Sequence, residues 1–287
     1  PVRLTRPGLD VGPLAWSPDG NTIAFKVAYR AGGGAGGIYA IPKQGGEEVK
    51  LTGLANVNFS TSLDWSPDGS QIVFSDLVPG TEQLAIYALD VNSRNKRRLT
   101  SPPRGDWGDW DPRFSPDGRT LAFKRVRGFW RDAVYLMAEG GRIRRLVEDS
   151  DVIWGHAWMP DGNGLIVSTP LGGSLLRLWR FPLSPGLEPV RITGEGLDAI
   201  TPASAHRSGR IAWVSRLEDT NIYRIPATGT GAPVQALSSR RVDAMREPVT
   251  PRMAALPLPA TAPEVGRSGL QGPTAPTRFA SPIWDAR

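Results

Sequence analysis

The pentapeptide "WSPDG" at residues 16–20 is the strongest indication of the fold, because the chain repeats it at nearly even spacing. It returns unchanged at residues 65–69, as "FSPDG" at 114–118 and as "WMPDG" at 158–162, and a degraded copy, "AHRSG", occupies 205–209. The first positions of successive copies are 49, 49, 44 and 47 residues apart. A period of this length, without heptads or helical periodicity, predicts an array of equivalent structural units.

Each repeat carries four short apolar segments in the same order. A first segment ends in the aromatic residue, and a second, such as "TIAFKV" at 22–27, follows the turn. After a variable loop come a third segment with a central aromatic, such as "IYAIP" at 38–42, and a closing one such as "KLT" at 50–52. Four short strands per repeat are the content of one propeller blade. We therefore predict an all-β fold, a β-propeller of four-stranded antiparallel blades.

Five blades are visible in residues 1–237, and we expect six or more in the intact protein. Their predicted limits are about 6–52, 53–100, 101–147, 148–193 and 194–237. The segment "VRLT" at 2–5 matches the last strand of a blade but has no first three strands before it. It is either a strand that closes the final blade or the remainder of another blade, and both alternatives require a blade beyond these five.

The "SPDG" turn has a mechanical explanation. Proline presets φ near −65°, aspartate bonds the backbone that follows it, and glycine accepts the left-handed conformation that closes a hairpin. Asp19, Asp68, Asp117 and Asp161 are therefore predicted to be structural turn residues rather than ligands of a cation. The recurrent Trp, Phe and Tyr are predicted to fill the space between neighbouring blades.

The composition excludes several kinds of site. The chain has no cysteine, so it holds no disulfide and no thiolate metal site. It has only two histidines, His156 and His206, and no Gly-x-Ser-x-Gly elbow. The glycine run at 32–37 joins two predicted strands and opens no helix, so it is predicted to be a flexible loop rather than a phosphate cradle. We predict no catalytic site, no cofactor, no metal and no enzymatic activity.

The charge does not favour nucleic acid as a partner. The net charge is +6, but the seven Arg and four acidic residues of 238–287 contribute half of this excess. The rest is dispersed, and "NKRR" at 95–98 is predicted to be a solvated strand end.

No apolar run approaches 18 residues, so we expect no membrane span in this segment. Because the chain begins at Pro1 without a leader, we expect a fragment of a longer protein or a processed chain. The compartment stays unknown, with a periplasmic or other extracytoplasmic location favoured over a cytoplasmic one.

The repeat resembles the WD40-like repeats of bacterial TolB-type propellers over residues 1–237. Within that group it is most similar to the propeller regions of bacterial winged-helix regulators of the CadC type and of serine/threonine kinases. The stretches that carry this likeness are "GDWGDWDPRFSPDG" at 105–118, "IWGHAWMPDG" at 153–162 and "EDTNIYRI" at 218–225. The resemblance implies a propeller in a multidomain signalling protein. The winged helix and the kinase are absent from this sequence, so DNA binding and phosphotransfer are not implied for it.

After Leu237 the repeat gives way to an irregular Pro- and Arg-rich tail, 238–287. A disordered linker is one interpretation. The other is a frameshift near Met245, because the third base of each codon, read with the first two of the next, allows Ser-Pro-Asp-Gly over 250–254. The same frame allows Asp-Gly-Ser-Asn-Pro-Leu-Arg-Leu-Thr, the ending of a blade, over 273–282. We favour a frameshifted sixth blade.

A functional site is predicted on one face of the propeller. In up-and-down blades, the loops that precede the first strand and those between the second and third strands share a face, while the "SPDG" turns lie on the other. Long, varied loops on a rigid scaffold usually carry function, and exposed Trp and Arg suit a protein or peptide hot spot. The candidate interaction residues are Trp107, Trp110, Phe129, Trp130, Arg131, Trp154 and His156.

Three functions fit this sequence, since a fold alone does not choose among them. We favour a non-catalytic interaction or sensing module of a bacterial signalling or regulatory protein, with a protein or peptide partner, or alternatively a small ligand. The second is a periplasmic TolB-like envelope protein. The third is the accessory propeller of a prolyl-oligopeptidase-type peptidase.

Overall fold

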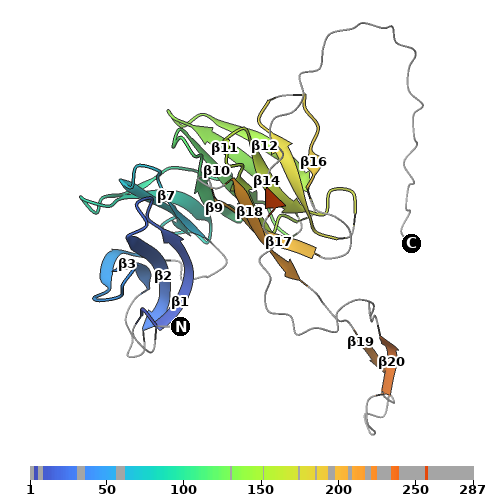
Figure 1. The fold of residues 1–287 in the computed structure, drawn as a ribbon, viewed down its shortest axis with the longest axis horizontal. Coiled ribbons are helices and arrows are strands. Elements are labelled where there is room, and N and C mark those ends of the chain that lie inside the picture. The colour runs from blue at the N-terminus through green and yellow to red at the C-terminus, as the bar shows by residue number, and fades with distance from the viewer. Residues whose placement is uncertain are drawn as a thin grey trace, which may run out of the picture. The chain divides into compact units, whose positions relative to one another are not determined.

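The fold is described from a computed structural model (Figure 1). It describes residues 3–5, 9–30, 36–55, 62–129, 131–150, 152–173, 175–184, 186–192, 198–205, 209–216, 221–224, 234–238 and 256–257. All of these belong to one unit, Pro1–Pro257. The described part contains strands and turns and no helix, which confirms the all-β propeller class.

Four repeats form four antiparallel blades of four strands each. Blade one is β1 Leu9–Trp16, β2 Thr22–Arg30, β3 Gly37–Pro42 and β4 Val49–Gly53. Blade two is β5 Leu63–Trp65, β6 Gln71–Leu77, β7 Leu84–Asp90 and β8 Lys96–Arg98. Blade three is β9 Gly108–Phe114, β10 Thr120–Val126, β11 Asp132–Ala138 and β12 Ile143–Ser150. Blade four is β13 Gly155–Trp158, β14 Gly164–Thr169, β15 Arg177–Pro182 and β16 Val190–Arg191. Within each blade every strand pairs with the next one in sequence.

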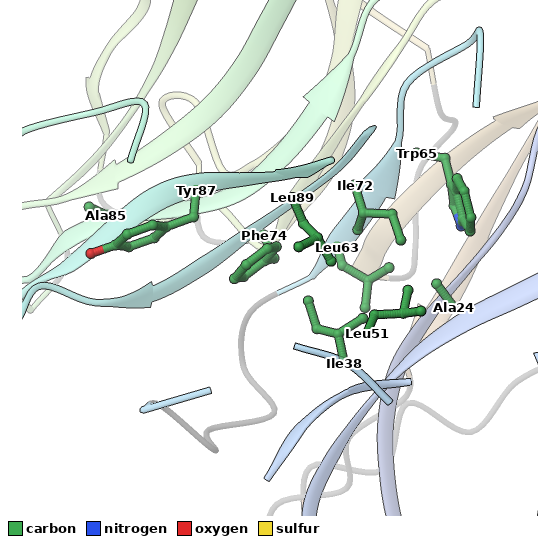
Figure 2. Packing of buried hydrophobic residues seen from close by; sticks show 10 residues of the cluster. All are labelled: Ala24, Ile38, Leu51, Leu63, Trp65, Ile72, Phe74, Ala85, Tyr87 and Leu89. Atoms are coloured by element: carbon green, nitrogen blue, oxygen red, sulfur yellow. The ribbon is translucent and has the colours of Figure 1, made fainter. Parts of the chain in front are cut away.

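The first strands of successive blades are neighbours. β1 contacts β5, β5 contacts β9, β9 contacts β13, and β13 contacts β17 Asp198–Ala205. Because side chains alternate along a strand, each blade offers one face to the blade before it and the other to the blade after it. The cluster of Figure 2 joins the two blades: Ala24 and Ile38 come from blade one, and Trp65, Phe74 and Tyr87 come from blade two. Equivalent clusters join blade two to blade three and blade three to blade four. The recurrent aromatics therefore form the packing between blades.

The "SPDG" turns repeat one hydrogen-bond pattern. In blade two the Ser66 hydroxyl donates to Asp68 Oδ1 at 2.6 Å, and the Ser70 N–H donates to the same oxygen at 3.0 Å. Gly69 has φ of +75° and donates its N–H to the Ser66 carbonyl. Asp19, Asp117 and Asp161 likewise accept the N–H two residues ahead. Each of these carboxylates therefore accepts at least one hydrogen bond within its own turn.

Blades two and three are joined into one sheet at a single point. Gly108 of β9 pairs in parallel with Leu84 of β7. Gly108 has φ of +122°, and a Cβ there would lie 2.1 Å from the Leu84 carbonyl oxygen. The backbones approach so closely that only glycine fits.

Blade five differs from the predicted four-stranded sheet. β17 pairs with β18 Arg210–Arg216, but the other edge of β18 pairs with β21 Leu256–Pro257. β19 Asn221–Arg224 and β20 Val234–Ser238 form a separate hairpin. A strand edge exposes unpaired N–H and C=O groups, and any extended segment that reaches it satisfies them. In this structure β21, from the segment expected to be irregular, takes that place.

Residues 3–5 carry no strand, so the closing strand expected at 2–5 stays a prediction. Leu4 nevertheless packs against Ile23, Phe25 and Tyr39. These side chains lie on the face of blade one that, in blades two to four, meets the preceding blade.

Candidate functional site

Three long loops of blades two and three belong to the predicted interaction face, and they are called here the loop face. They are residues 78–83, 99–107 and 127–131. Gln83, between β6 and β7, donates its side-chain amide to the carbonyls of Pro103 and Asp106 at 2.6 and 2.8 Å. Those two residues belong to the loop that precedes β9. One amide therefore ties the loops of adjacent blades together.

The loop face carries an aromatic pair, Trp107 and Phe129. Trp107 precedes β9, and Phe129 lies between β10 and β11. Their ring centroids are 4.7 Å apart with an interplanar angle of 79°, an edge-to-face arrangement. Trp107 is 42% exposed and Phe129 is 77% exposed. Two large rings from different loops are thus held together and still presented to solvent.

Arg131 and Trp154 are also exposed, whereas Trp110 is half-buried. The Arg127 N–H donates to the Arg131 carbonyl at 3.0 Å and closes the loop that carries Phe129. Trp154 precedes β13 and is 41% exposed. Trp110 lies under Lys124, whose Nζ is 5.7 Å from the indole centroid. Trp130 lies outside the described residues.

His156 does not belong to the exposed face. Its side chain is 3% exposed, because it points to the same side of β13 as Trp158, two residues later, which packs against blade three. Burial lowers its pKa to about 4; the Asp111 carboxylate opposes this shift, and Arg113 and Lys124 add to it. The imidazole is therefore neutral at pH 7, and the expectation that it contributes to an interaction surface is not met.

A buried ionic layer lies beneath the aromatic pair. Arg125 of β10 holds Asp109 of β9 with two hydrogen bonds, Nε–Oδ1 at 2.6 Å and Nη2–Oδ2 at 3.0 Å. Asp109 is 0% exposed. The guanidinium also lies 4.7 Å from the Tyr135 ring centroid. This pair fixes the start of β9 two residues after Trp107.

Lys124 extends this layer toward blade four. Its Nζ lies 3.8 Å from Asp111 and 3.7 Å from Asp132, and it donates to the Ile153 carbonyl at 3.1 Å. Asp132 accepts the Ile153 N–H at 3.0 Å. Burial raises the pKa of Asp132, and Lys124 opposes the shift.

Lys26 occupies the equivalent position in blade one and is buried. Burial lowers its pKa to about 8, against the attraction of Asp76 and Asp111. Sequence reasoning missed both lysines. The available signal was the repeated "AFK" at 24–26 and 122–124, which places a cation at one position of the second strand.

The opposite face carries a groove of about 1000 Å³ between blades two and three. Turn residues Asp68 and Asp117 line it together with Arg97, Arg119 and Phe114. The pKa of each aspartate is lowered, first by the hydrogen bond from its own turn serine. Both carboxylates are thus engaged in hydrogen bonds within their own turns.

Within the described ranges, no three His, Asp or Glu side chains gather closely enough to hold a metal ion. The same residues include no helix with the length and apolar character of a membrane-spanning segment.

Curated relatives align with part of this chain. No family model matches it. The uncharacterized peptidase YuxL of Bacillus subtilis is 29% identical over 148 residues, 50% of this chain and 22% of that protein. The uncharacterized protein Atu1656 of Agrobacterium fabrum is 27% identical over 150 residues, 52% and 48% of the two chains. The Tol-Pal system protein TolB of Francisella tularensis is 29% identical over 99 residues, 34% and 22%. The chain thus spans about half or less of the length of these relatives.

Solved structures share the fold over most of the chain. A TolB-type protein from Agrobacterium tumefaciens superposes with a TM-score of 0.58 at 21% identity, covering 79% of this chain and 80% of that one. A prolyl endopeptidase gives 0.54 at 17% identity, covering 79% and 35%. An oligogalacturonate lyase gives 0.56 at 16% identity, covering 82% and 68%. The chain therefore has a TolB-like β-propeller fold, which solved TolB structures and part of a prolyl endopeptidase share.

Proposed function

We propose that this chain is a non-catalytic propeller module that binds a protein or peptide partner through the loop face. The observation that carries the proposal is the Trp107–Phe129 pair, 4.7 Å apart and 42% and 77% exposed. Exposing large rings to water is unfavourable, and such rings are enriched in binding hot spots. Arg131 beside Phe129 adds an exposed cation, so we expect a partner segment with an apolar side chain near an acidic one.

The support beneath the pair favours recognition by a preformed surface. The buried Asp109–Arg125 pair and the Gln83 hydrogen bonds fix both flanks of the loop that carries Trp107. A surface that is ordered before binding loses less conformational entropy on association. We place this module in a bacterial signalling or regulatory protein with an extracytoplasmic location; the likeness to the Tol-Pal protein TolB supports the location.

The test is selection of a phage-displayed random dodecapeptide library on the immobilised chain. Clones enriched on the wild type are expected to bind the Trp107→Ala/Phe129→Ala double variant at least tenfold more weakly, which corresponds to about 1.4 kcal/mol of lost binding free energy. Leu187→Ala is the matched control, since Leu187 is 61% exposed in the loop between β15 and β16. Failure to enrich any clone, or enriched clones that bind the double variant within twofold of the wild type, would contradict the proposal.

A second candidate is the accessory propeller of a peptidase. The 29% identity to the peptidase YuxL and the shared fold with a prolyl endopeptidase support it. In that case the propeller would act beside a hydrolase domain, and the loop face would admit or exclude peptide substrates. A genomic reading frame that continues into a nucleophile elbow Gly-x-Ser-x-Gly would favour this candidate over the first.

A further inference from the structure

Hydrogen bonds join the first strand of a blade to the preceding blade. The Trp65 indole N–H donates to the Ala15 carbonyl at 3.2 Å, and that of Trp158 donates to the Arg113 carbonyl at 3.0 Å. Both acceptors are the residue just before the aromatic position of the preceding repeat. In blade five, Ser204 pairs with Ile211 as Trp158 pairs with Leu165, so Ser204 takes the place of the aromatic residue. Its hydroxyl donates to the Trp158 carbonyl at 2.6 Å. The end of a first strand is thus built to meet another blade.

The first strand of blade one presents two residues of this surface to solvent. Trp16 is 52% exposed, whereas the equivalent Trp65 and Trp158 are 8% and 2% exposed. Two residues earlier, Leu14 is 56% exposed, whereas the equivalent Leu63 is fully buried. The same residue types at the same repeat positions of the first strand therefore differ in burial. On the same face of blade one, Phe25 and Tyr39 are already covered, and Leu4 packs against them.

Blade five presents the complementary surface. Val214 of β18 is 55% exposed. Val214 lies three residues after Ile211, as Lys26 lies three residues after Ile23, and both isoleucines pair with the aromatic position of the first strand. At this position of the second strand, Lys26, Ser75 and Ser168 are all buried. Ser168 is covered by the next blade, because its hydroxyl donates to the Ala199 carbonyl of β17 at 2.6 Å. Val214 is therefore placed to face a further blade.

We infer that these two surfaces bind the two sides of one sixth blade, and that the gene encodes this blade in a second reading frame after about Met245. Over 250–254 that frame permits Ser-Pro-Asp-Gly, with the glycine forced by the codons of Met253 and Ala254. The serine would lie 44 residues after the corresponding position of the fifth repeat, His206, within the 44–49 spacing of the other copies.

The ending of the encoded segment also fits. Over 273–282 the frame permits a closing Leu-Arg-Leu-Thr. Its threonine would lie 28 residues after the turn glycine, against 29 to 32 residues in the first four blades. A blade of this length would supply a backbone carbonyl to the exposed Trp16 indole and apolar cover to the exposed Leu14 and Val214. This inference is independent of the proposed function, because it concerns the edges of the fold and not the loop face.

The first test is the nucleotide sequence. We expect the genomic DNA of residues 246–287 to carry an open second frame with the Ser-Pro-Asp-Gly codons. A stop codon within it, or codons that exclude this tetrapeptide, overturns the inference whatever any variant protein does.

The second test measures the protein by hydroxyl-radical footprinting with mass spectrometry. In the present chain Trp16 should oxidise about sixfold faster than Trp65, in the ratio of their exposed fractions, 52% and 8%. A single-nucleotide insertion after the Met245 codon moves translation into the second frame. In that protein the Trp16 rate should fall to that of Trp65, while Trp107 on the loop face keeps its rate. An unchanged Trp16 rate in a folded frame-restored protein refutes the inference.

Discussion

Replacing Asp109 by Asn should destabilise blade three far more than a typical single substitution does. Asp109 is 0% exposed and makes two hydrogen bonds to Arg125, whose side chain is 10% exposed. Asp109→Asn keeps the shape of the side chain but removes the charge of the carboxylate that bonds the buried guanidinium, which then retains the weaker attraction of Asp106. Removing one partner of a buried ion pair costs about 3–5 kcal/mol. For a domain of this size, that is a fall of about 6–20 °C in the thermal midpoint.

Equilibrium urea unfolding followed by circular dichroism measures this loss. Glu82→Gln is the control, because it removes a carboxylate that is exposed in the loop before β7, and we expect a change within about 0.5 kcal/mol. The double variant Asp109→Leu/Arg125→Met replaces the pair by apolar side chains and should recover most of the lost stability, because no unpaired charge remains buried. A loss below about 1 kcal/mol in Asp109→Asn would show that water or another group compensates Arg125. A double variant as unstable as the single one would refute the electrostatic argument.

Three further substitutions test other parts of the structure. Trp158→Phe removes the donor to the Arg113 carbonyl, and we expect a loss of about 2 kcal/mol in urea unfolding. Gly108→Ala places a Cβ 2.1 Å from the Leu84 carbonyl oxygen, so it should cost about 3 kcal/mol or more, or yield no soluble protein on expression. His156 has a folded pKa of about 4, below its unfolded value, so the unfolded chain binds more protons between these pH values. The contribution of His156 to the free energy of unfolding is therefore present near pH 7 and is lost as the pH falls from about 6.5 to 4. His156→Leu should reduce the pH dependence of the urea midpoint over this range.

The repeats made the fold predictable because each blade has the same order of strands and turns within one repeat. The strand order, the "SPDG" hairpins and the inter-blade role of Trp65 and Trp158 follow from alternating apolar residues and turn chemistry. Blade five was less predictable. Pattern alone placed its third strand beside β18, whereas the free edge of β18 pairs with Leu256–Pro257.

The candidate site was predictable as a set of loops and not as a geometry. The sequence placed Trp107 and Phe129 on one face, 22 residues apart, and the structure brings their rings to 4.7 Å. It also placed His156 there, although alternation along β13 turns that side chain into the interface with blade three. Exposure depends on which side of a strand a residue occupies. In a short strand between two turns, the amino-acid sequence alone does not determine that side.

The repeat, the turn residues and the all-β class follow from the sequence alone, because they depend on contacts within about 50 residues of chain. Which charges pair depends on the tertiary structure. Asp109 meets Arg125, and Lys124 lies between Asp111 and Asp132, through strand registers that no local pattern specifies. The tertiary structure also determines that Trp16 is exposed while its equivalents Trp65 and Trp158 are buried. These identical residues differ because a side chain between blades is buried only where an adjacent blade covers it. The pentapeptide does not specify whether that blade is present.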